Sequence, residues 1–272
     1  MKKIAKLFFV VAMMSLLSGC IDVTMKVKVN PDGSGVIEET VLMGGTFIEM
    51  MNQMMSFMDT TGTQKFEIFK EDELMNEAAE YGEGVKYLKG EKIDAGGKSG
   101  YKAVFSFTDI TKLKIDEDPV SKVPSDAMSM SDQEPQEKKP ITFAFEKGTT
   151  SKLTIILPEF DKSGIDDEQA VEDTAQAMDP AWEEQAKTMM KDMHIAILVQ
   201  PMGTITSTNA TNVENNVITL MEMDFGKILE QPGKFDELKK HNPKSFEEAK
   251  EMLKDIPGIK MEFNQKVEVS FK

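Results

Sequence analysis

The sequence predicts an α+β protein in which antiparallel β-hairpins form a curved sheet with helices packed on one face. Apolar and polar residues alternate along several segments, as is typical of strands with one wet face. Methionine and phenylalanine recur at helical spacing in one segment, and Ser245-x-x-Glu248 forms a capping box before another. Because hairpins and helices follow one another along the chain, the class is α+β.

Turn residues between alternating segments predict three β-hairpins, the first across Asn30-Pro31-Asp32-Gly33-Ser34-Gly35. These hairpins comprise residues 23–29 with 36–43, 85–94 with 101–110, and 141–146 with 153–157. Further strands are expected at 195–200, 204–209 and 217–225, and one C-terminal strand over 259–271. Helices are expected at 47–58, at 71–81, from Asp179-Pro180 onward, and from Ser245 to just before Pro257.

Residues 1–19 are predicted to be a signal peptide. A leader with three lysines precedes an apolar stretch at 7–17, which is far shorter than the roughly 20 residues of a membrane-spanning helix. This stretch ends in Leu17-Ser18-Gly19-Cys20, which resembles the lipobox of bacterial lipoproteins. The resemblance implies that the thiol of Cys20 is acylated, with palmitate as the expected lipid, and that Cys20 is the first residue after cleavage.

The mature chain, residues 20–272, is expected to be a single extracytoplasmic domain. Residues 116–140 contain four prolines, many charges and no aromatic residue, so this segment is predicted to be a flexible loop. The lipid on Cys20 would hold the domain to a membrane. Ile21 stands where an inner-membrane retention signal would be aspartate, which favours the outer membrane if the host has one.

Composition excludes several classes of protein. All 32 basic residues are lysine, and the net charge of −15 falls to −18 when cleavage removes Lys2, Lys3 and Lys6. Such a chain is a poor partner for nucleic acid or an anionic lipid surface. It has two histidines and one cysteine, and no Gly-rich phosphate loop, Gly-x-Ser-x-Gly or His-Glu-x-x-His motif. We therefore expect no enzymatic activity, no cofactor and no metal site.

A methionine stripe is the candidate ligand-binding feature. Phe47 begins a helical i, i+3, i+4 pattern that continues through Met50, Met51, Met54, Met55 and Met58. Methionine adapts to apolar partners, so the stripe could line a lipid site, although such residues also form ordinary cores. The spacing could alternatively offer thioethers to Cu(I), a soft ion.

Parts of the chain resemble a loose group of bacterial lipoproteins, the LppM-like lipoproteins. The resemblance lies in the lipobox, the hairpin across residues 30–35, and the tract from Thr206-Ser207-Thr208-Asn209 through Asn216-Val217-Ile218-Thr219. It implies a curved sheet with helices of the kind that holds a lipid or other apolar ligand, and it supplies no catalytic residues. The favoured function is therefore a membrane-anchored, non-enzymatic lipoprotein that binds an apolar ligand. A structural or protein-interaction role and methionine-based copper binding are the alternatives.

Overall fold

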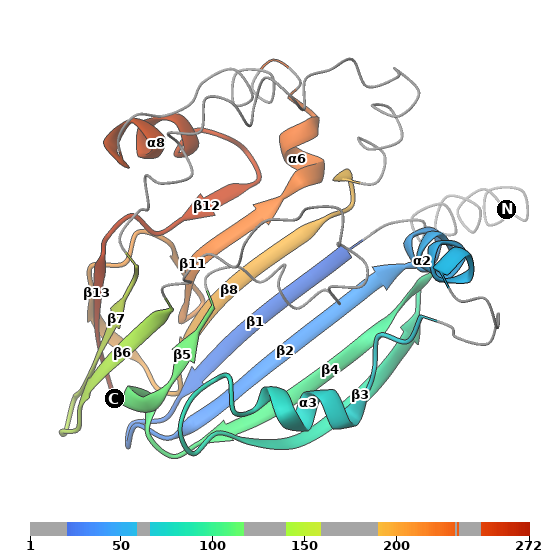
Figure 1. Cartoon of the computed structure of the whole chain (residues 1–272). Helices are drawn as coiled ribbons and strands as arrows, with labels where there is room; N and C mark the ends of the chain where they lie inside the picture. Colours follow the sequence, from blue (N-terminus) through green and yellow to red (C-terminus); the bar gives the residue numbers. More distant parts are fainter. Residues whose placement is uncertain (1–20, 59–65, 117–139, 159–189, 232, 234–245) are drawn as a thin grey trace, which may run out of the picture.

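The computed structural model describes residues 21–58, 66–116, 140–158, 190–231, 233 and 246–272. These residues build two β-sheets, a larger and a smaller one, with a few helices (Figure 1). The structure is therefore α+β and rich in strands. Three predicted features lie outside the described residues. They are the predicted signal peptide with Cys20, the interior of the predicted loop at 116–140, and the helix predicted from Asp179-Pro180.

The larger sheet has the strand order β10-β11-β8-β1-β2-β4-β3, and β12 pairs with β11. The strand bounds are β1 Ile21–Val29, β2 Gly35–Gly44, β3 Lys86–Ala95, β4 Lys98–Phe107, β8 His194–Pro201, β10 Val213–Glu214, β11 Val217–Asp224 and β12 Ile259–Met261. The sheet is not wholly antiparallel as predicted, because β1 and β8 pair in parallel. Parallel neighbouring strands need a long crossover connection between them. Here the connection from β1 to β8 is the whole segment of chain that contains β2 to β7 (Gly35 to Ile156).

The three predicted hairpins are confirmed. β1 pairs with β2 from Ile21 opposite Met43 to Val29 opposite Gly35, and β3 pairs with β4. In the third hairpin, β6 (Ile141–Glu146) pairs with β7 (Ser151–Ile156). In the first turn the carboxylate of Asp32 accepts hydrogen bonds from the N–H and hydroxyl of Ser34, at 3.0 and 2.6 Å. Gly33 follows with a φ of +88°, a conformation that glycine adopts without steric cost.

The smaller sheet is antiparallel, in the order β5-β6-β7-β13-β9. Its strands are β5 Lys114–Ile115, β6 Ile141–Glu146, β7 Ser151–Ile156, β9 Ile205–Thr208 and β13 Lys266–Phe271. The prediction of one strand over 259–271 was wrong, because β12 joins the larger sheet and β13 the smaller one. The chain turns between them at Glu262, whose carboxylate accepts hydrogen bonds from the backbone N–H groups of Thr211 and Asn264.

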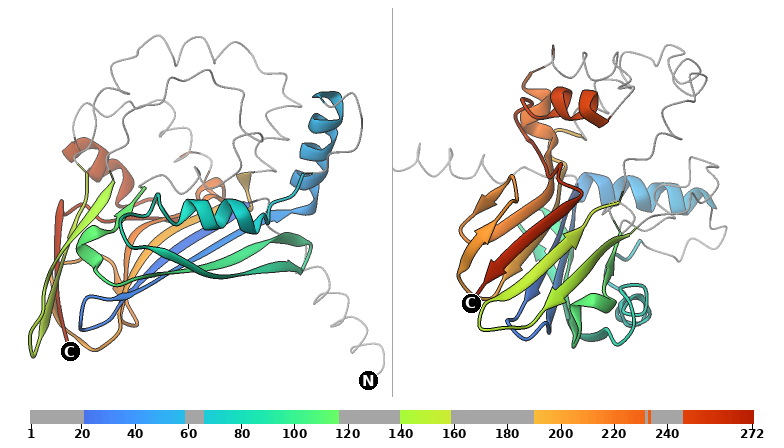
Figure 2. Two further views of the ribbon diagram at one scale, coloured as in Figure 1. Left: turned by 60° about the horizontal axis from the view of Figure 1, so that its bottom comes forward. Right: turned by 90° about the vertical axis from the view of Figure 1, so that its left-hand side faces the viewer.

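The helices are α2 Gly45–Met58, α3 Glu71–Glu77, α6 Phe225–Leu229 and α8 Phe246–Leu253, with a 3₁₀ turn, η1, at Ile110–Lys112. Helix α2 confirms the prediction from the methionine stripe, whereas α3 ends earlier than the predicted Tyr81. Helix α6 was not predicted; Asp224 caps it by accepting a 3.2 Å hydrogen bond from the N–H of Lys227. Figure 2 shows α2 and α3 on the same side of the larger sheet.

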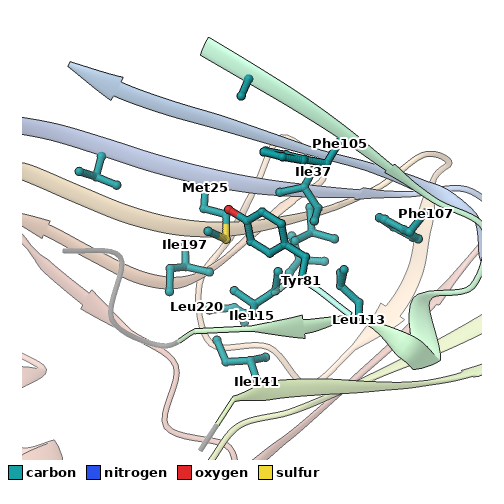
Figure 3. Packing of buried hydrophobic residues seen from close by; sticks show 14 of the residues in the cluster. Met25, Ile37, Tyr81, Phe105, Phe107, Leu113, Ile115, Ile141, Ile197 and Leu220 are labelled. Atoms are coloured by element: carbon teal, nitrogen blue, oxygen red, sulfur yellow. The ribbon is translucent and has the colours of Figure 1, made fainter. Parts of the chain in front are cut away.

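One hydrophobic core contains side chains from both sheets. Met25, Ile37 and Phe105 of the larger sheet are fully buried, and so are Ile115 and Ile141 of the smaller sheet (Figure 3). Tyr81, from the turns after α3, lies among them in the same view. None of the helices that the structure describes is long and apolar enough to cross a bilayer.

Candidate functional site: a buried carboxylate between two tyrosines

The methionines of the predicted stripe differ in how far their side chains are buried. Met51 is buried and belongs to the hydrophobic core, Met55 is half-buried, and Met50 is 37% exposed. Met54 and Met58 lie within α2, but their side chains are outside the described part of the chain, as is Cys20. The helix is therefore anchored to the core by part of its stripe and presents Met50 to solvent.

A carboxylate that the sequence analysis did not single out lies inside the core. Glu39 stands on β2 between Ile37 and Val41, and all three side chains point inward with no exposed surface. In a strand, successive side chains alternate between faces, so residues 37, 39 and 41 share one face. Burying a carboxylate is costly unless hydrogen bonds compensate, so the partners of Glu39 define the site.

Two phenolic hydroxyls supply those hydrogen bonds. Tyr101, on β4 next to β2, donates to Oε1 of Glu39 at 2.5 Å. Tyr81 donates to Oε2 and also lies 3.3 Å from a carboxylate oxygen of Glu77 on α3. The ring of Tyr81 packs edge-on against Phe105, with centroids 5.0 Å apart, and this contact helps to hold the hydroxyl toward Glu39.

The environment keeps both tyrosines in the donor state. Burial raises the pKa of Tyr81 and of Tyr101 far above the usual value, and the negative charges of Glu39 and Glu77 raise the two pKa values further. A protonated phenol next to a carboxylate can only donate its hydrogen bond to it. The Tyr81–Glu39–Tyr101 cluster is thus a buried acceptor held by two neutral donors.

The other buried carboxylate of the described chain shows what is distinctive here. Glu262 accepts hydrogen bonds from two backbone N–H groups and from Thr211 and Asn264 side chains, so it fixes a turn. Among the described residues, Glu39 accepts hydrogen bonds from two side chains, which lie 42 and 62 residues away in the sequence. Glu39 therefore fixes no local backbone conformation, unlike Glu262.

Aromatic residues connect this cluster to the methionine helix. The backbone N–H of Phe66 donates a 2.8 Å hydrogen bond to Oδ1 of Asn52 on α2. Three residues later, the Phe69 ring lies 6.2 Å from the ring of Tyr101. Phe66 and Phe69 are both partly buried against the core. Phe66 and Phe69 therefore link α2 to the ring of Tyr101 through contacts within one core.

A second polar cluster lies at the start of β1, on the opposite face of the sheet. Nδ1 of His194 is 3.4 Å from Asp22, and Nε2 is 3.8 Å from Glu222. The hydrogen bond to Asp22 raises the pKa of His194 despite partial burial. Burial alone would raise the pKa of Asp22, but the hydrogen bond and charge of His194 together with Lys98 lower it. Both groups are partly exposed, so the pair is screened.

The residues described contain no group of three or more histidine, cysteine, aspartate or glutamate side chains arranged to hold a metal ion. What the Tyr81–Glu39–Tyr101 cluster can do chemically is accept a hydrogen bond from a bound group in a dry, apolar setting. Its tyrosines are held as neutral phenols, which suits recognition of a polar head better than proton transfer.

Comparisons with known proteins give one distant structural similarity. No family model matches the chain, and no curated protein matches it. Among solved structures, it is similar to the folded domain of the Mycobacterium tuberculosis protein LppM, over 94% of this chain and 91% of that one. The identity is 11% and the TM-score 0.32, so nothing about the site is taken from this similarity.

Proposed function

We propose that the protein is a lipid-anchored envelope protein that binds an apolar molecule carrying a hydrogen-bond donor at one end. The observation that carries this proposal is the Tyr81–Glu39–Tyr101 cluster, a carboxylate with no exposed surface inside an otherwise apolar core. Sites for apolar ligands are typically lined by apolar side chains with a few polar groups that fix orientation. The proposed role is binding and not catalysis.

The anchor in this proposal is the lipid on Cys20. The described structure begins with Ile21 already in β1 and paired with Met43, so the folded domain starts one residue after Cys20. Helix α2 begins two residues after Met43. The acyl chains would therefore hold that end of the larger sheet at the membrane, outside the cytoplasm, and at the outer membrane in a host that has one.

The chemistry of the site sets the class of ligand. Glu39 is an acceptor, so a hydroxyl or amine head can replace one of its phenol donors, whereas a carboxylate head would meet a like charge. The apolar part of the ligand would lie along residues 66–69 toward α2, where Met50 and Met55 are accessible. Long-chain alcohols, acylglycerols and similar lipids satisfy both requirements.

A pair of fluorescent ligands tests the proposal. A labelled long-chain monoacylglycerol should bind the purified protein more tightly than a fatty acid of the same chain length and label. The triple variant Glu39→Leu/Tyr81→Phe/Tyr101→Phe replaces the polar groups by apolar ones of similar shape, so it should remain folded. It should also lose the preference for the monoacylglycerol.

Tyr87→Phe is the matched control, because Tyr87 makes an exposed 3.0 Å hydrogen bond with Glu71 and should not affect binding. Folded wild-type protein that takes up neither ligand would overturn the binding function and leave a structural role in the envelope. Equal affinity of wild type and triple variant would show that Glu39 does not contact the ligand head.

A further inference from the structure

The outward face of the larger sheet is rich in lysine although the whole chain is acidic. On β1 the side chains of Lys26 and Lys28 point away from the core, since those of Met25, Val27 and Val29 are fully buried. Strand register places residues of β3 and β4 on the same face. We define the lysine face by its six outward lysines on β1, β3 and β4: Lys26, Lys28, Lys86, Lys89, Lys98 and Lys102.

Few carboxylates oppose these lysines. The outward acidic residues of β1 to β4 are Asp22, Glu38 and Glu91. Glu38 lies between two lysines, 2.7 Å from Lys28 and 3.9 Å from Lys102. Lysines outnumber carboxylates on β1 to β4, so this part of the face is locally positive, whereas the mature chain as a whole carries a net charge of −18. Glu222 and Asp224 of β11 lie on the same side of the sheet beyond β8, outside the lysine face.

The face is also open on the described structure. In the left view of Figure 2, α2 and α3 lie on the other side of strands β1, β2, β4 and β3. Lys86 and Lys89 are exposed, and the side chain of Lys102 is 44% exposed. Short outward apolar residues, Val36 and Val104, lie in the same rows as the lysines.

The position of the anchor identifies the partner of the lysine face. On the proposed function, Cys20 is acylated, and it directly precedes the strand that carries Lys26 and Lys28. A strand rises about 3.3 Å per residue, so Lys26 is only about 20 Å along β1 from the anchored residue. We propose that the lysine face docks on the anionic headgroups of the membrane to which the protein is tethered. Net charge alone argues against this contact, but charge is segregated to one face by strand alternation.

Site-directed fluorescence on the acylated protein tests this orientation. Acylation consumes the thiol of Cys20, the sole cysteine, so one introduced cysteine can be labelled uniquely. A probe at Val104→Cys should be quenched by headgroup nitroxides in phosphatidylcholine vesicles that contain phosphatidylglycerol, and much less in phosphatidylcholine alone. A probe at Met75→Cys, 52% exposed on α3, should stay unquenched in both.

Charge variants separate the lysine face from a general charge effect. No described carboxylate forms an ion pair with Lys26 or Lys89, so Lys26→Gln/Lys89→Gln should leave the fold intact. Each lost lysine should weaken membrane contact about fivefold, so quenching of the Val104 probe should fall strongly. The control, Lys114→Gln/Lys152→Gln, makes the same charge change on the smaller sheet, where both lysines are exposed, and should preserve quenching.

Flotation of the protein with vesicles reports the anchor independently of the probe. Flotation with an unquenched Val104 probe would overturn the docking proposal and would still support the lipid anchor. The partner of the lysine face would then be an acidic protein. Quenching that is equal at Val104 and Met75 would likewise contradict it. Loss of flotation together with an intact mass that lacks acyl chains would refute the anchor, which is a different failure.

Discussion

Tyr81→Phe tests the energetic weight of the buried cluster. The substitution removes the hydroxyl that donates to Glu39 but keeps the ring that packs on Phe105, so it opens no large cavity. A hydrogen bond to a charged group contributes about 1.5–3 kcal/mol, and its loss leaves the fully buried carboxylate with the hydrogen bond from Tyr101. We expect the free energy of unfolding to fall by about 2–3 kcal/mol in urea denaturation at neutral pH, followed by circular dichroism.

The same substitution at Tyr87 supplies the comparison. Its hydroxyl hydrogen bond with Glu71 is exposed, so Tyr87→Phe should change the free energy of unfolding by less than about 0.5 kcal/mol. In a Glu39→Leu background, Tyr81→Phe should cost far less than in wild type, because the acceptor is gone. The reasoning would be refuted if Tyr81→Phe cost no more than Tyr87→Phe, or if its cost were unchanged without Glu39.

Three further predictions follow from burial and titration. Met51→Ala should lower the free energy of unfolding by about 2–5 kcal/mol, whereas Met50→Ala, at an exposed site, should stay within about 0.5 kcal/mol in the same urea assay. Burial raises the pKa of Tyr81 and Tyr101 far above the unfolded value of about 10, so their contribution to stability is complete below about pH 10 and falls above it. Their phenolate absorbance should appear only as circular dichroism is lost, whereas Tyr87, whose hydroxyl makes an exposed hydrogen bond and whose pKa is raised to about 12, should ionise in the folded protein. The pairing of His194 stabilises the fold fully below the unfolded pKa of 6.5, and this contribution is lost as the pH rises through the raised folded pKa. In wild type the free energy of unfolding should therefore decline above pH 6.5 by under about 1 kcal/mol. His194→Gln should make this decline smaller. A steeper decline in that variant would contradict the pairing with Asp22.

Local elements were predictable because their signals are local. The hairpin of β1 and β2 follows from alternation on both sides of a turn that needs Gly33, and α2 follows from the spacing of its methionines. Even the candidate site left a signal, since Glu39 occupies an inward position between Ile37 and Val41. A carboxylate at a core position of a strand requires a partner, and that alone marks it for attention.

Long-range pairing was not predictable, since alternation is the same in parallel and antiparallel strands. The parallel contact of β1 with β8 therefore carries no local signature. The C-terminal segment keeps an apolar pattern past Glu262, and only the hydrogen bonds from Thr211 and Asn264 show that it changes sheet there. The partners of Glu39, Tyr81 and Tyr101, are likewise fixed by tertiary packing.

The lysine face shows the same division. Alternation predicts that Lys26 and Lys28 share the wet side of β1. Joining them to Lys89 and Lys102 requires the registers of β2, β3 and β4, which the sequence does not reveal. Net charge averages over this segregation, so composition alone does not distinguish a chain with one lysine-rich face from a uniformly acidic chain.

Native mass spectrometry of the protein extracted from membranes tests the central claim most directly. The proposed function predicts a chain that begins at Cys20 with covalent acyl chains, together with one noncovalently bound lipid that carries a hydroxyl or amine head. The triple variant Glu39→Leu/Tyr81→Phe/Tyr101→Phe should keep the covalent mass and lose the bound lipid. A folded wild-type protein that starts at Cys20 but carries neither acyl chains nor a bound lipid would contradict the account.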